Sequence, residues 1–186
     1  MLRTAVVLSV ALALFAGVYC GGKKAEPQAQ TEAQVTPLPA EALQALTDDE
    51  IVKFVKAVPA AAAALKAANY VAPQPAEDEQ VAVVLTKMVD GMKDVAGLND
   101  ALVGAGTNWD EFRGTMMRVM AASAAMSADM AGEMSAAYAA DTSAEAKEMV
   151  KKIDALKTAC ANVPAENKQM VQKHGEELSV LQQLSQ

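Results

Sequence analysis

The fold is decided by residues 109–139, WDEFRGTMMRVMAASAAMSADMAGEMSAAYA. Large apolar side chains recur there at helical steps, and on a helical wheel they fall within roughly 120° of one another. This methionine stripe consists of Trp109, Phe112, Met116, Met120, Met126, Met130, Met134 and Tyr138. The opposite side carries Glu111, Arg118, Asp129 and Glu133. The stretch therefore predicts a long amphipathic helix that buries its stripe in a core.

Helical patterns continue on both sides of this stretch. Thr47 and Glu50 have the spacing of a capping box, and Pro59 is expected to stop or kink the helix that they begin. A short helix at 60–68 is predicted to follow. Further helices are predicted at residues 76–95, 98–103, 143–162 with Thr142 and Glu145 as a second capping box, and from Pro164 onward. No segment alternates like a strand, so we expect an all-α fold: an antiparallel helical bundle of about four long helices plus one or two short ones.

The N-terminus has the features of a secretory signal peptide. Arg3 is followed by a nearly unbroken apolar run from Ala5 to Gly17, and Cys20 and two glycines end the segment. A membrane-spanning helix needs about 20 apolar residues. The apolar run here is shorter, which favours a cleaved signal over a permanent anchor.

Cys20 gives this segment a more specific resemblance. An apolar run that ends at a cysteine and turns polar at once resembles a bacterial lipoprotein signal, in which that cysteine receives the lipid and becomes the first residue. Tyr19 departs from the small residue that usually precedes the cysteine, so the lipobox is atypical. Ordinary secretion and an uncleaved anchor are the alternatives. In the two-membrane envelopes of this class, Gly21 after the cysteine implies the periplasmic face of the outer membrane.

These observations divide the chain into three parts. Residues 1–19 are expected to be the signal peptide, and residues 20–46 the lipidated Cys20 with a disordered tether rich in Ala, Gln, Glu, Thr and Pro. Residues 47–186 are expected to form the helical bundle domain, for which no family is recognised. The formal net charge of −7 without a basic cluster argues against a nucleic-acid partner.

Few residues suggest chemistry. The methionine stripe could bind Cu(I) through thioethers, but core packing next to alanine explains it more simply. His174, the one histidine, lies on an apolar face with Glu177 one turn on, as a hydrogen-bonded core or boundary residue would. Cys160 lies on another apolar stripe and is expected to be a buried free thiol. The carboxylates cluster at helix starts or alternate with lysines, as on solvated faces.

The sequence therefore predicts a non-enzymatic cell-envelope lipoprotein without a cofactor. Its membrane contact would be the lipid on Cys20, and its helical domain would bind another protein or structure the membrane face. Two alternatives remain at this point. One is a periplasmic ligand-binding bundle whose methionine-lined interior holds a lipid, haem or copper, and the other is a helical periplasmic chaperone.

Overall fold

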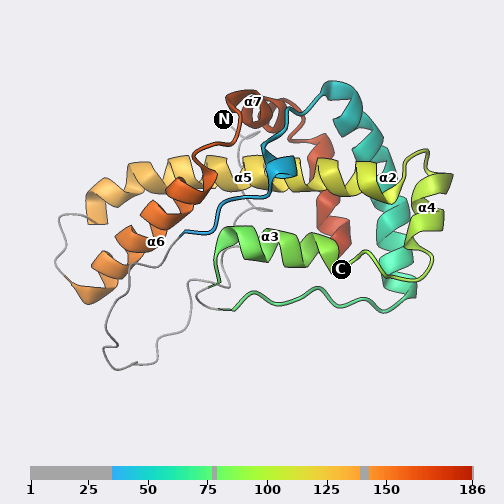
Figure 1. Ribbon diagram of the computed structural model, residues 1–186. Coiled ribbons are helices and arrows are strands. Elements are labelled where there is room, and N and C mark those ends of the chain that lie inside the picture. Colours follow the sequence, from blue (N-terminus) through green and yellow to red (C-terminus); the bar gives the residue numbers. More distant parts are fainter. Residues whose placement is uncertain (1–34, 77–78, 139–142, 186) are drawn as a thin grey trace.

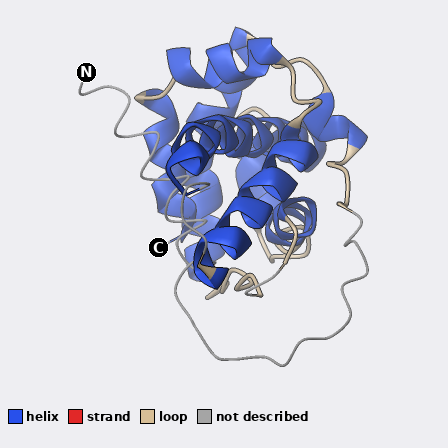
Figure 2. Ribbon diagram, turned by 90° about the vertical axis from the view of Figure 1, so that its left-hand side faces the viewer, coloured by secondary structure: helices blue, strands red, loops and turns tan. Residues whose placement is uncertain are grey.

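The computed structural model describes residues 35–76, 79–138 and 143–185, and over these residues the chain forms helices and loops with no strand (Figure 1, Figure 2). The predicted all-α class is confirmed. The predicted signal peptide, Cys20 and residues 21–34 of the predicted tether lie outside the described residues. Among the described helices, none combines the length and the apolar character needed to cross a membrane.

The described elements differ in length more than the sequence suggested. In chain order they are η1 (Ala40–Leu43), α2 (Asp48–Ala67), α3 (Val81–Asp90), α4 (Leu98–Gly104), α5 (Trp109–Tyr138), α6 (Ala144–Cys160), α7 (Ala165–Lys173) and η2 (Glu177–Ser185), where η marks a 3-10 helix. Only α2, α5 and α6 are long, with 20, 30 and 17 residues. The expected last helix is divided into α7 and η2.

The start of α2 matches the prediction, but its course does not. The Thr47 hydroxyl accepts from the Glu50 amide at 3.3 Å, and the Glu50 carboxylate accepts from the Thr47 amide at 2.9 Å, which completes the capping box. Pro59 lies inside the helix, which continues to Ala67. Of the expected stop or kink, the stop is therefore wrong, and the short helix predicted at 60–68 is part of α2. Proline removes one helical hydrogen bond, but the side chains around it hold the helix against the core. Those buried side chains are Phe54, Ala57, Val58, Ala61 and Leu65.

The helix predicted at 76–95 is shorter, and Gly91 lies where it ends. A Cβ at Gly91 would lie 2.9 Å from the Tyr70 hydroxyl oxygen and 2.8 Å from the Lys87 carbonyl oxygen. Both distances are shorter than real Cβ contacts, so any other residue at this position would force the Lys87 backbone or the Tyr70 side chain to shift. Met92 lies beyond the helix in a turn and is still buried. Residues 77–78 of the predicted first turn lie outside the described residues.

Helix α6 begins one residue later than the second predicted capping box implies. Ser143 is the N-cap, and its hydroxyl accepts from the Ala146 amide at 3.2 Å. Thr142, the predicted cap, lies outside the described residues.

Helix α5 lies at the centre of the molecule and is not amphipathic along its middle. All side chains at positions 115–122 are buried, which means that the helix is covered on every side there. Arg118, expected on the solvent side, has an exposed fraction of only 8%. The side of α5 opposite the methionine stripe was expected to face solvent, but it carries small side chains that let neighbouring helices approach closely. These are Ala121, Ala122, Ala124, Ala125 and Ala128.

The other helices meet α5 in more than one direction. In Figure 1, α2 and η2 run side by side across the direction of α5, and these two elements contact each other. The most extensive contact of α5 is with α6, which packs against its C-terminal half. The predicted antiparallel bundle is therefore not confirmed by this arrangement.

The first described segment also corrects the predicted domain boundary. Residues 35–46, here called the strap, were expected to belong to the disordered tether. Instead Leu38, Ala42 and Leu46 are buried in the core, and η1 contacts α5. Their spacing of four residues does not stand out in the sequence as a buried face, because alanines and prolines separate the leucines. The ordered domain therefore begins before Thr47.

Among the described side chains of the methionine stripe, those from Trp109 to Met126 belong to the core or pack against it. Phe112, Met116 and Met120 are buried, and Trp109 and Met126 pack partly buried against the same core. Met130 has an exposed fraction of 36%. The side chains of Met134 and Tyr138 lie outside the described part of the structure.

We therefore expect truncation of methionines in α5 to have unequal effects. Met117 is fully buried, so Met117→Ala should lower the free energy of unfolding by about 2–5 kcal/mol through lost burial and a cavity. Met117→Leu should cost less than about 1.5 kcal/mol because volume is nearly conserved. Met130→Ala, the matched control in the same helix, should cost less than about 1 kcal/mol. Urea unfolding of the three variants measures this, and equal losses for the two alanine variants would contradict the burial described.

Candidate functional site

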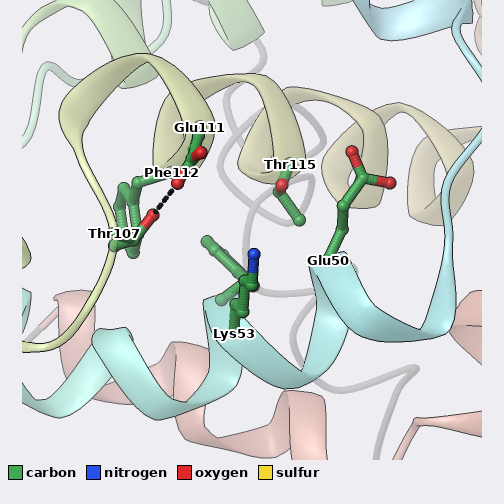
Figure 3. A pocket seen from close by; sticks show the side chains of 7 residues that line it. Glu50, Lys53, Thr107, Glu111, Phe112 and Thr115 are labelled. Carbon is green, nitrogen blue, oxygen red and sulfur yellow. Dashed lines mark hydrogen bonds between the residues drawn. The ribbon is translucent and has the colours of Figure 1, made fainter.

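A small cavity lies between α2 and the beginning of α5 (Figure 3). Its volume is about 110 Å³. The aromatic part of its wall is Phe54 and Phe112, whose ring centroids are 4.9 Å apart. The polar lining consists of Glu50, Lys53, Thr107, Glu111 and Thr115. The site is therefore a polar notch over a buried aromatic pair.

Glu50 is the most constrained carboxylate of this notch. It completes the capping box of α2, and its Oε1 lies 2.9 Å from Nη2 of Arg118. Burial alone would raise its pKa, but hydrogen bonds from Thr47 and Arg118 outweigh burial and hold the pKa of Glu50 below its ordinary value. Glu50 is therefore ionised at neutral pH and already paired.

The remaining polar groups of the notch come from both helices and the turn before α5. The Thr107 hydroxyl donates to the Glu111 carboxylate at 3.0 Å, and Asn108 caps α5 by accepting from the Glu111 amide at 3.0 Å. Lys53 points from α2 toward α5 in Figure 3. The predicted cap, Thr107 or Asn108, is thus Asn108.

The size and chemistry of the notch limit what it can hold. Pockets that bury small-molecule ligands have volumes of about 300–1,000 Å³. The lining holds carboxylates already paired, one ammonium group and two hydroxyl groups, and it contains no histidine or cysteine that could pair as base and nucleophile. Over residues 35–76, 79–138 and 143–185, no three His, Cys, Asp or Glu side chains gather closely enough to hold a metal ion.

His174 lies where the sequence placed it, at the boundary of the core. Its Nε2 is 2.7 Å from Oδ1 of Asp48, the first residue of α2, and its Nδ1 is 3.9 Å from Glu177. Lys173 donates to the same Asp48 oxygen at 2.5 Å. Hydrogen bonds from Lys173 and then His174 hold the pKa of Asp48 below its ordinary value. The histidine therefore joins the end of α7 to the start of α2.

Cys160 is a buried free thiol, as predicted. Burial raises its pKa to about 11, and the nearby Asp129 carboxylate adds to the shift. Since the thiolate is the reactive form of cysteine, this thiol is unreactive at neutral pH. Cys20, the predicted lipidation site, lies outside the described residues.

The burial of Arg118 and of Asn167 was not predicted from the sequence. Arg118 donates from Nε to the Gly114 carbonyl at 3.0 Å and from Nη1 to the Ala45 carbonyl at 2.7 Å, in addition to its contact with Glu50. Asn167 has no exposed surface. The available signal was the position of Arg118, a single charge within the apolar run Met116 to Ala122. Asn167 gave no such signal, since a polar residue in a short amphipathic helix is ordinary.

Comparisons of the chain with protein-family models, with curated proteins and with solved structures found no match.

The paired carboxylate of Glu50 leads to a prediction about acid stability. The folded-state pKa of Glu50 lies below the value of 4.5 for a free glutamate. The contribution of Glu50 to the free energy of unfolding is therefore fully present above pH 4.5 and is lost as the pH falls through the folded-state pKa. We expect Glu50→Gln to be less stable than wild type at pH 6, with the difference narrowing toward pH 3. Denaturant unfolding at each pH measures it. Asp49→Asn, an exposed carboxylate in the same helical turn, is the control, and a constant difference for Glu50→Gln would contradict the assignment.

Burial of Cys160 predicts slow thiol chemistry. In the native protein at pH 7.5, a maleimide or aromatic disulfide reagent should label Cys160 at least about a hundredfold more slowly than after denaturation, because both access and thiolate formation are suppressed. Mass spectrometry of the peptide containing Cys160 follows the reaction. Rapid labelling of the native protein would show that the C-terminal end of α6 opens readily.

Proposed function

We propose that the chain is a non-enzymatic lipoprotein of the bacterial cell envelope, anchored by a lipid on Cys20 and carrying a helical interaction domain. Its proposed place is the periplasmic face of the outer membrane. The proposal rests first on the leader, in which a basic end, an apolar run and a terminal cysteine stand in the order of a lipoprotein signal. The proposal does not depend on whether the helices form an antiparallel bundle.

The observation that best supports an N-terminal anchor is the attachment of the strap to the domain. Side chains from α5 and α7 hold the backbone of residues 44–46, and two leucines of the strap are buried. Only residues 21–34 would then separate the lipidated cysteine from the strap. With their polar composition they would reach about 20 Å by square-root scaling. The anchor would thus hold the domain close to the membrane.

The role of the domain is proposed from what its interior contains. A bundle that stores lipid, haem or copper would need the methionine stripe to line a cavity. Instead Met116 and Met120 are packed into the core, and the notch described above is lined by two phenylalanines and five charged or hydroxyl side chains, with no methionine. An interaction or structural role therefore fits better than ligand storage. The chaperone alternative is less favoured because Leu46-Thr47-Asp48-Asp49-Glu50 occurs once and serves as a helix cap.

The anchor is tested at Cys20. We expect mass spectrometry of the mature protein to find a diacylglyceryl group on Cys20 as its first residue, and Cys20→Ser to abolish labelling by a fatty-acid analogue. Cys160→Ala, which alters the other cysteine, should keep both lipid and membrane association. A mature protein that starts with a free amine at Lys23, or that retains Met1, would refute the proposal.

The interaction role is tested in the same cells. Crosslinking in intact envelopes should give the same defined adduct for wild type and for Cys160→Ala. Cys20→Ser should lose that adduct if anchoring brings the domain to its partner.

A further inference from the structure

The strap fills a groove that other parts of the chain build. In Figure 1 its blue segment lies across α5. Leu38, Ala42 and Leu46, four residues apart, are buried, whereas Ala40, Gln44 and Ala45 between them are exposed. One face of the strap is therefore seated in the core and the other faces solvent.

The groove holds the strap by its backbone. Asn167 accepts from the Leu46 amide at 2.8 Å and donates to the Gln44 carbonyl at 2.8 Å, so that both ends of its amide group are used. Arg118 donates to the carbonyl of Ala45, the residue between them, at 2.7 Å. These three contacts recognise groups that every peptide offers, while the apolar positions supply selectivity. Binding sites for extended peptides combine the same two features.

The clamp residues belong to the groove and not to the strap. Arg118 lies on α5 and Asn167 on α7, and they are 73 and more than 120 residues away from their strap partners in sequence. The strap is joined to α2 only through Thr47, which is exposed and has an extended backbone at φ −110° and ψ 158°. A rotation before Thr47 is the movement by which residues 35–46 would leave the groove, with the capping box of Thr47 and Glu50 kept on the side of α2.

We propose that this groove is a peptide-binding site, that the strap occupies it in cis, and that the same segment of a second copy can occupy it in trans. The ligand is a peptide that forms a short 3-10 turn at its centre, as Ala40–Leu43 does in the strap, and then offers an unblocked extended backbone. It carries leucine, alanine and leucine at intervals of four residues. An exchange between copies replaces each contact by an identical one, which is the reason that swapping of a chain segment costs little free energy.

The experiment uses the purified full chain in detergent micelles and a fluorescent peptide of residues 35–47. The chain variant Leu38→Asp weakens the strap in cis, and Ala40→Asp places the same charge on its exposed face as the matched control. Fluorescence anisotropy should show the peptide binding Leu38→Asp at least about tenfold more tightly than Ala40→Asp or wild type, because there the competing cis segment is weakened.

Two controls test how the peptide is recognised. A peptide methylated on the Leu46 amide nitrogen loses the donor to Asn167 and should bind at least about tenfold more weakly, since an unpartnered buried acceptor remains. A peptide with aspartate in place of Leu38 should bind as weakly. Equal binding of all three peptides would overturn the proposal.

Circular dichroism and a cooperative thermal transition show whether Leu38→Asp keeps its fold. If the fold is kept and the peptide does not bind, the groove is not a peptide site. If Leu38→Asp unfolds as a whole, the strap is an inseparable part of the core, and the proposal is equally overturned.

Discussion

The interaction on which the structure depends is the burial of two polar side chains, Asn167 and Arg118, against the backbone that precedes α2. A buried amide or guanidinium group is costly unless its hydrogen bonds are made. Both ends of the Asn167 amide are satisfied by Gln44 and Leu46, and Arg118 has carbonyl and carboxylate partners. These hydrogen bonds of Asn167 and Arg118 are therefore complete only while a strap occupies the groove. Hydrophobic contacts add to this dependence, but the polar contacts fix the register of the strap.

Much of the secondary structure could be predicted because its signals are local. The capping box at Thr47, the long helix from Trp109 and the burial of Cys160 all follow from spacing within a few residues. The effect of Pro59 was not predicted correctly. Its local cost to the helix is visible in the sequence, but the packing that holds the helix together around it is not. The close approach of Tyr70 to Gly91 joins residues about twenty positions apart, and no local pattern contains that contact.

The candidate site was less predictable for a related reason. A helical wheel of α5 identifies the buried face from the large apolar side chains and gives alanine no weight. Arg118 was therefore expected on a face exposed to solvent. That face is covered because its alanines admit close neighbours, and a charge among them must then find partners inside the protein. Which partners it finds, residues 45 and 50, depends on tertiary structure alone. The sequence could show that Arg118 was unusual, but not what it holds.

The separation between the strap and its clamp has a consequence for the order in which the chain can fold during synthesis. The segment around residues 44–48 makes contacts with Asn167, Lys173 and His174, which are synthesised more than 120 residues later. Long-range contacts of this kind can form only after the intervening chain is complete, and they slow folding. A growing chain can build the hairpin of α5 and α6 from local contacts, but its N-terminal segment has no clamp to enter. The strap is thus fixed only after the segment that carries its clamp has been made.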